Sequence, residues 1–148
     1  MKTRYTLARF DRIMLERWHA APALGDLRDI LDAFALARKD LGADLIVIEV
    51  VSAAAGRPDA ETIREAMRDI RRLRYLRSLH LVVVEGDSVE HALVRGVFTP
   101  LAFLLGESVA MFRTVEEAVA RACEETGQEP AALLREIREA GLLVSPGP

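Results

Sequence analysis

Two short apolar runs constrain the fold of this chain more than any other feature. Residues 45–51 read LIVIEVV and residues 79–84 read LHLVVV. An uninterrupted run of this kind is typical of a strand covered on both faces, as in a parallel sheet. The helical pattern between the runs makes them a parallel crossover unit. We therefore predict Leu45–Val51 and Leu81–Val84 as adjacent, parallel, central strands of a mixed sheet of about five strands.

Helical periodicity accounts for much of the remaining chain. Apolar residues recur three and four positions apart in four intervals: 24–41, 59–76, 87–105 and 114–126. Thr114 and Glu117 have the spacing of a capping box, which marks a helix start. Gly42 and Gly127 stand where a helix ends in a C-cap glycine, and Pro130 stands in the first turn of one more helix.

The amino-terminal segment has a different period. Residues 5–10 and 13–18 alternate in character, which predicts two half-exposed strands joined as a hairpin through Asp11 and Arg12. The expected order is ββαβαβαβα with one mixed sheet and an extra C-terminal helix, an α/β fold. We expect a single domain over residues 1–143 and a flexible tail over 144–148.

Composition excludes several classes of protein. A chain of 148 residues with 51% apolar residues forms one ordinary globular domain. Its net charge of −3 argues against a nucleic-acid-binding domain. One cysteine excludes an internal disulfide, and no apolar run reaches the length of a membrane span. The first ten residues lack the apolar core of a signal peptide, so we expect a cytoplasmic protein.

The order of elements resembles a STAS-type domain, the fold of bacterial anti-sigma-factor antagonists and related lipid-binding modules. The resemblance rests on the opening hairpin, the two apolar strands and the closing segment 111–118, MFRTVEEA. It covers residues from about Arg4 to Glu125. It implies a regulatory module of a bacterial cytoplasm that acts through protein contacts or binds a small ligand.

The loop after the first apolar strand departs from that family. Phospho-regulated members carry an acceptor serine at the start of the next helix, whereas this chain has Asp59 there. We therefore predict no phosphorylation switch at this helix. Ser52, Gly56, Asp59 and Thr62 form the candidate ligand or partner loop. Ser52 and Thr62 are either phosphate acceptors or ligand contacts, or else an ordinary strand end and an ordinary surface residue, which we favour.

Arginines are densest in the helix over 59–76. At about 100° per residue, one face collects Arg64, Arg68, Arg71 and Arg72. This basic face suits an acidic partner, a phosphate or a lipid headgroup. The alternative, which we favour, is a solvated face partly neutralised by neighbouring acidic residues.

No motif for catalysis or metal binding is present in the sequence. His19, His80 and His91 lack the spacing of a metal pair, and we expect His80 to be a buried residue with a hydrogen-bond partner. Cys123 lies on the apolar stripe of its helix, as a structural thiol does. We expect no metal, no cofactor and no enzymatic activity.

The helix expected over 87–105 carries more apolar residues than one packed face needs. Phe98 and Phe103 are the candidate anchors of an interface, because aromatic side chains dominate interface energetics. This favours a homodimer or a stable complex with another protein. The alternative is that both aromatic side chains fill the core under the sheet.

Three functions remain in order of preference. The first is a non-catalytic STAS-like module that works through protein contacts, with regulation as its role. The second is a small-ligand protein of the same fold, taking a lipid, an apolar molecule or an anion such as a nucleotide. The third is an enzyme whose site is assembled from scattered residues, which would require converging polar groups in one cleft.

Overall fold

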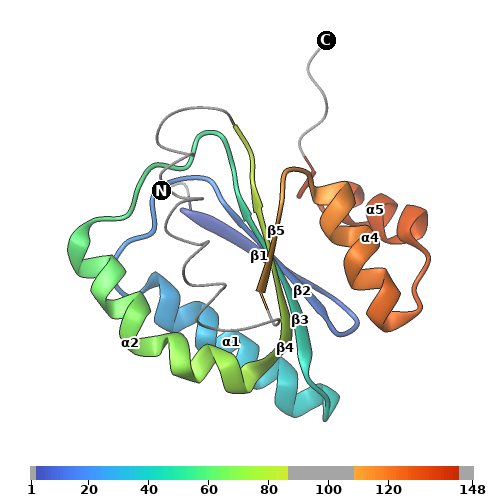
Figure 1. Ribbon diagram of the computed structural model, residues 1–148, viewed down its shortest axis with the longest axis horizontal. Helices are drawn as coiled ribbons and strands as arrows, with labels where there is room; N and C mark the ends of the chain where they lie inside the picture. Colours follow the sequence, from blue (N-terminus) through green and yellow to red (C-terminus); the bar gives the residue numbers. More distant parts are fainter. Residues whose placement is uncertain (1–2, 87–108, 144–148) are drawn as a thin grey trace.

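A mixed sheet with helices on both faces forms the core of the fold (Figure 1). The computed structural model describes residues 3–86 and 109–143, without the side chains at positions 67 and 70–78. Its strands are β1 (Tyr5–Phe10), β2 (Ile13–Trp18), β3 (Leu45–Val51), β4 (Arg77–Val84) and β5 (Val109–Phe112). Its described helices are α1 (Asp26–Leu41), α2 (Ala60–Leu76), α4 (Val115–Thr126) and α5 (Pro130–Glu139).

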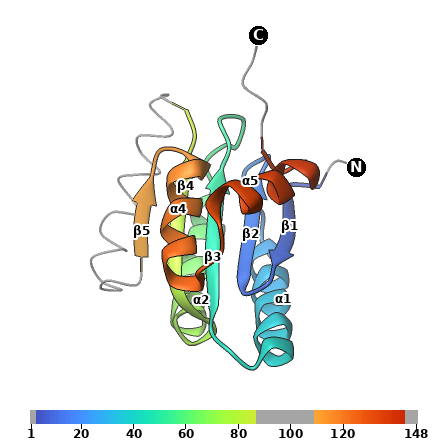
Figure 2. The same cartoon turned by 90° about the vertical axis from the view of Figure 1, so that its right-hand side faces the viewer.

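The strands follow one another across the sheet in chain order, β1-β2-β3-β4-β5 (Figure 2). β1 and β2 are antiparallel, and every other neighbouring pair is parallel. The two apolar runs are adjacent, parallel and interior, as predicted. The carboxyl ends of β2, β3 and β4 therefore meet at one edge of the sheet, where α/β folds commonly bind ligands.

Two apolar layers stabilise the sheet, one on each face. The first layer packs β2, β3 and β4 against α4, α5 and the segment after α5, and includes Ile48, Leu81 and Ile137. The second packs the opposite face against α1, with Phe34 at its centre. α2 lies beside α1 on that second side (Figure 1). Alternation along each strand decides which layer a side chain joins.

Helix ends agree with the sequence signals. Thr114 Oγ1 accepts a hydrogen bond from Glu117 N at 3.2 Å, which confirms the predicted start of α4. Gly42 and Gly127 end α1 and α4 at φ +62° and +75°, a left-handed conformation that glycine adopts without a steric penalty. Pro130 begins α5 as predicted.

The prediction of two half-exposed strands is wrong for β2. All six of its residues are buried, including Glu16 and Arg17. The cause is its position, because β2 lies between β1 and β3 and has helices on both sides. Alternation of polar and apolar residues predicted an exposed face, but here the polar side chains have buried partners instead.

Some expectations fall on residues that the structure does not describe. They are the helix over 87–105 with Phe98 and Phe103, His91, and the tail 144–148. In the described ranges, no helix combines the length and the apolar character needed to cross a bilayer.

Candidate functional site

Ser52 is a structural residue at the end of β3. It is 8% exposed, and its hydroxyl donates a hydrogen bond to the carbonyl of Trp18 at 2.5 Å. Its backbone N–H donates to the same carbonyl at 3.2 Å. Ser52 therefore ties the end of β3 to the end of β2, and its hydroxyl is turned inward rather than toward a ligand.

Asp59 caps the amino terminus of α2. Its Oδ1 accepts a hydrogen bond from the backbone N–H of Thr62 at 2.7 Å. The hydrogen bond from the backbone N–H of Thr62 is the main reason that the pKa of Asp59 lies below its ordinary value. The carboxylate is thus charged at the positive end of the helix dipole, where a negative charge is stabilising.

Thr62 is buried, at 4% exposure, so its interpretation as an ordinary surface residue is wrong. Gly56, in the same loop, lies close to the chain before α1, since a Cβ placed on it would be 3.5 Å from the Cβ of Ala21. The predicted loop residues therefore fix the connection from β3 to α2.

The basic face predicted on α2 is exposed where side chains are described. Arg64 and Arg68 are both exposed. Arg64 makes a local bond, from Nε to the carbonyl of Ala60 at 3.3 Å. The helical backbone continues through positions 71 and 72. Glu65 lies on the other side of the helix, where it is 8% exposed and accepts the backbone N–H of Gly25 at 3.2 Å.

The amino end of α1 is anchored by a pair of charges. Arg4 donates to Asp26 through Nε at 2.6 Å and through Nη2 at 2.9 Å. This bidentate pair is the main reason that the pKa of Asp26 is lowered. It joins the start of β1 to α1 at the same edge of the sheet as Ser52 and Asp59.

Buried polar side chains lie on the α1/α2 face of the sheet. Glu16 on β2 is directly opposite Glu49 on β3. Glu16 Oε1 accepts a hydrogen bond from Trp18 Nε1 at 3.3 Å, and Glu49 Oε2 lies 2.8 Å from His80 Nε2. His80 is 7% exposed, so the expectation of a buried histidine with a partner is confirmed. Sequence reasoning did not single out the two glutamates, because the strand over residues 13–18 was predicted to be half-exposed.

Arg17 is buried on the opposite face, beside the apolar layer under α4 and α5. Its Nε donates to the carbonyl of Leu142 at 2.7 Å, and its Nη2 lies 2.7 Å from Glu85 Oε1. Glu85 directly follows β4, and Leu142 follows α5. One side chain on β2 therefore holds together two chain segments that are distant in the sequence. The hydropathy pattern alone gave no signal for this role.

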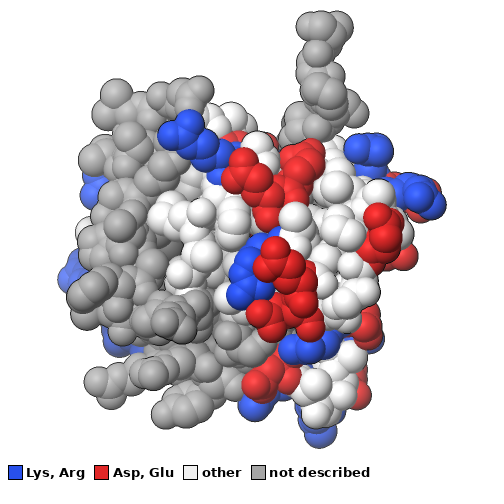
Figure 3. All heavy atoms as spheres, turned by 45° about the vertical axis from the view of Figure 1, so that its right-hand side comes forward, with Lys and Arg blue, Asp and Glu red and all other residues white. Residues whose placement is uncertain are grey.

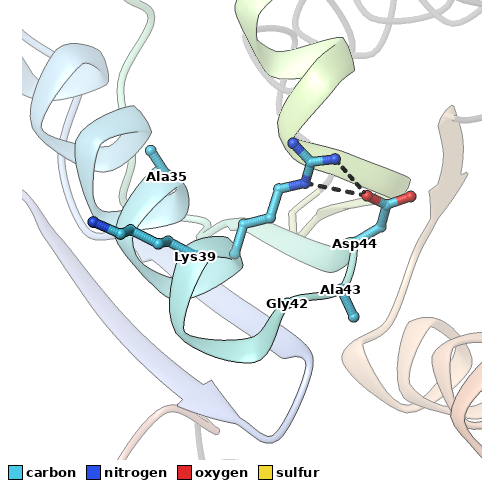
Figure 4. Close-up of a pocket in the computed structure, with 6 residues that line it drawn as sticks. Ala35, Lys39, Gly42, Ala43 and Asp44 are labelled. Carbon is cyan, nitrogen blue, oxygen red and sulfur yellow. Dashed lines mark hydrogen bonds and ion pairs between the residues drawn. The ribbon is translucent and has the colours of Figure 1, made fainter.

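A surface hollow of about 330 Å³ lies at the carboxyl end of α1 (Figure 4). Its lining is Ala35, Arg38, Lys39, Gly42, Ala43 and Asp44. Arg38 is paired with Asp44 at 2.9 Å, and Figure 4 shows Lys39 extending away from that pair. The charged groups therefore do not converge on a common ligand position.

Cys123 and His19 are two further candidate side chains within the described residues. Cys123 is 5% exposed within the apolar layer, and burial raises its pKa, as expected for a structural thiol. His19 is exposed and lies 2.7 Å from the hydroxyl of Thr6. Within residues 3–86 and 109–143, no group of three acidic, histidine or cysteine side chains has metal-binding geometry.

The side of the molecule that carries α4 is acidic (Figure 3). Its exposed carboxylates include Glu116, Glu117 and Glu124. Arg121 offsets part of this charge, with Nη1 2.9 Å from Glu125 Oε1. The acidic side and the arginines of α2 thus lie on opposite faces of the sheet (Figure 1).

Comparison with known proteins found no relative of this chain. No protein-family model, curated protein or solved structure matches the chain.

Proposed function

We propose that this chain is a non-catalytic, STAS-like interaction module that recognises a protein partner through the exposed arginine face of α2. The observation that carries the proposal is the contrast within α2. Arg64 and Arg68 are exposed, whereas Thr62 and Glu65 on the other side of the helix are buried. A rigid helix that displays a row of guanidinium groups suits an acidic protein surface.

The start of α2 supports this role. Asp59 caps the helix, and Ser52 fixes the strand before it, so the arginines are presented on a well-anchored element. Interfaces formed by pre-ordered elements lose less conformational entropy on binding. Phospho-regulated STAS-type domains carry an acceptor serine at this helix start, whereas this chain has a charged Asp59. We therefore still predict a module without a phosphorylation switch.

A charge-reversal experiment tests the proposal. The double variant R64E/R68E should lose the partner that co-purifies with the wild-type chain from its native cells, as measured by native mass spectrometry. The matched control is R135E/R138E, which reverses two exposed arginines on α5. Both variants should retain the wild-type melting temperature, because neither pair is buried.

Retention of the same partner by R64E/R68E would contradict the proposal. Equal loss by both double variants would also contradict it, since the effect would then follow net charge rather than the α2 face.

The second candidate is a small-ligand protein of the same fold, and its lipid or apolar form needs an enclosed apolar cavity. The hollow at the end of α1 does not support it, because Arg38, Lys39 and Asp44 contribute to its lining and it is open to solvent.

A further inference from the structure

Arg17 is a charged side chain that the packing of the sheet does not explain. Its side chain is 3% exposed, and it shares its face of β2 with Ile13 and Leu15 of the apolar layer. A buried ion pair often contributes little net stability, because desolvation offsets the attraction between the charges. Stability alone therefore does not account for an arginine at this position.

The guanidinium group is only partly satisfied. Nε donates to the carbonyl of Leu142, and Nη2 pairs with Glu85, each at 2.7 Å. Nη1 is buried and has no hydrogen-bond partner among the described residues. Buried polar atoms are nearly always hydrogen-bonded to protein, ordered water or a ligand, so Nη1 is a donor available to one of these partners.

The chemistry of that interaction follows from the shape of the group. Nη1 and Nη2 lie side by side at the end of a planar guanidinium, which matches two oxygens of one carboxylate or phosphate group. The ion pair with Glu85 joins Oε1 to Nη2. An external oxyanion that replaced Glu85 could accept hydrogen bonds from both nitrogens.

The location also suits a ligand. Arg17 lies near the carboxyl end of β2, and Glu85 directly follows β4, at the edge where α/β sheets bind ligands. The side chain of Glu85 is 25% exposed, so it lies between the buried guanidinium and solvent. Gly86 follows at φ +101°, a conformation that favours glycine.

We propose that Nη1 and Nη2 of Arg17 form a binding site for a carboxylate or phosphate group, and that Glu85 occupies this site when no ligand is bound. Binding exchanges the internal carboxylate for the external oxyanion and releases Glu85 toward solvent. The site is on the α4/α5 side of the sheet and does not depend on the interaction proposed for α2.

Thermal melts of E85Q test the site with defined probes. Sodium phosphate and sodium acetate are each compared with sodium chloride at equal ionic strength, so that the two sources of an oxyanion are distinguished. Removing the competing carboxylate should tighten the apparent affinity for at least one anion by about tenfold relative to the wild-type chain. The matched control is E125Q, which removes the partner of the surface residue Arg121 and should produce no such gain.

The double variant R17M/E85Q should lose the anion-specific rise in melting temperature. An equal response of E85Q and R17M/E85Q would overturn the proposal. A response of E85Q no greater than that of the wild-type chain or of E125Q would overturn it as well.

Side-chain nitrogen NMR gives a second measurement that keeps Arg17 in place. In E85Q, titration with the anion that gave the larger melting response should shift the Arg17 Nε resonance with saturation, while the Arg121 resonance stays nearly constant. Equal shifts at both arginines, or no shift at Arg17, would contradict the site even if R17M/E85Q failed to fold.

Discussion

Glu16 and Arg17 are neighbours on β2, yet their buried charges have different surroundings. On the α1/α2 face, Glu16 accepts a hydrogen bond from Trp18, and the facing Glu49 pairs with His80. On the α4/α5 face, Arg17 reaches one carbonyl and one carboxylate, both supplied by segments that follow an element. The first group lies within the sheet, and the second lies at its edge.

The comparison indicates when a buried charged side chain can still bind a ligand. Glu16 and Glu49 have donors on the sheet itself, so rearranging them would disturb β2, β3 and β4 together. Glu85, by contrast, is partly exposed and can be hydrated when it leaves Arg17. A buried donor with an exchangeable partner can serve a ligand, whereas a donor fixed within the sheet serves the fold.

The largest loss of stability should come from substitutions in the two apolar layers. We expect the layers on the two faces of the sheet to stabilise the fold to a similar extent. Phe34→Ala should lower the free energy of unfolding by about 3–5 kcal/mol, because it leaves a cavity under α1. Ile137→Ala under α5 should lower it by about 2–5 kcal/mol. Both side chains are at most 1% exposed. Urea denaturation measures both, and a cost near zero for either would show that its layer is not a packed core.

Removing a polar partner should cost more stability on the α1/α2 face of the sheet than on the α4/α5 face. His80→Leu leaves the part-buried Glu49 without its nearest donor, and should cost about 1–3 kcal/mol. Arg17→Met should cost less than His80→Leu, about 1–2 kcal/mol, because Glu85 can be hydrated at the edge and only the neutral carbonyl of Leu142 loses a buried donor. Urea denaturation of both variants gives the order directly. A larger cost for Arg17→Met than for His80→Leu would reverse the comparison.

The pair of Arg4 and Asp26 predicts a dependence of stability on pH. The pKa of Asp26 is lowered in the folded chain, so the unfolded chain binds more protons near the ordinary pKa of an aspartate. The stability contributed by this ion pair is fully present above the ordinary aspartate pKa of about 4. It is lost as the pH falls through the lower pKa that Asp26 has in the folded chain. Asp26→Asn should cost about 1–2 kcal/mol at neutral pH.

The stability of Asp26→Asn should also depend less on pH in the acid range than that of the wild-type chain. Urea midpoints measured between about pH 5 and pH 2 should converge for Asp26→Asn and the wild-type chain as acid removes the wild-type advantage. Parallel curves over this range would show that the ion pair does not stabilise the start of α1.

The smallest effect concerns the cap of α4. Thr114→Ala removes the acceptor for the Glu117 N–H and should lower the free energy of unfolding by about 1 kcal/mol. Thr114→Ser retains a hydroxyl and should stay close to the wild type. Chemical denaturation distinguishes the two substitutions, and equal loss in both would assign the effect to the methyl group rather than to the cap.

Much of the fold could be predicted from the sequence because local signals were strong. The apolar runs predicted β3 and β4, and Thr114, Gly127 and Pro130 marked helix boundaries that the structure confirms. These signals depend on backbone geometry within a few residues, so a single sequence contains them.

The polar sites could not be predicted, because their partners are distant in the sequence. Arg17 meets Leu142 across 125 positions, and its burial depends on the place of β2 between β1 and β3. Ser52 was a candidate for the ligand or partner loop, but its hydroxyl bonds to Trp18, which only the register of β2 and β3 brings near. Alternation along a strand indicates two faces, and the tertiary contacts decide whether either face is exposed.

A crystal structure of E85Q grown in sodium phosphate, compared with one grown in sodium chloride, tests the central claim about Arg17 most directly. We expect an oxyanion bound by Nη1 and Nη2 in phosphate, with Nε still donating to the carbonyl of Leu142. A guanidinium that turns to other protein groups, with no anion on Nη1 or Nη2 in phosphate, would contradict it.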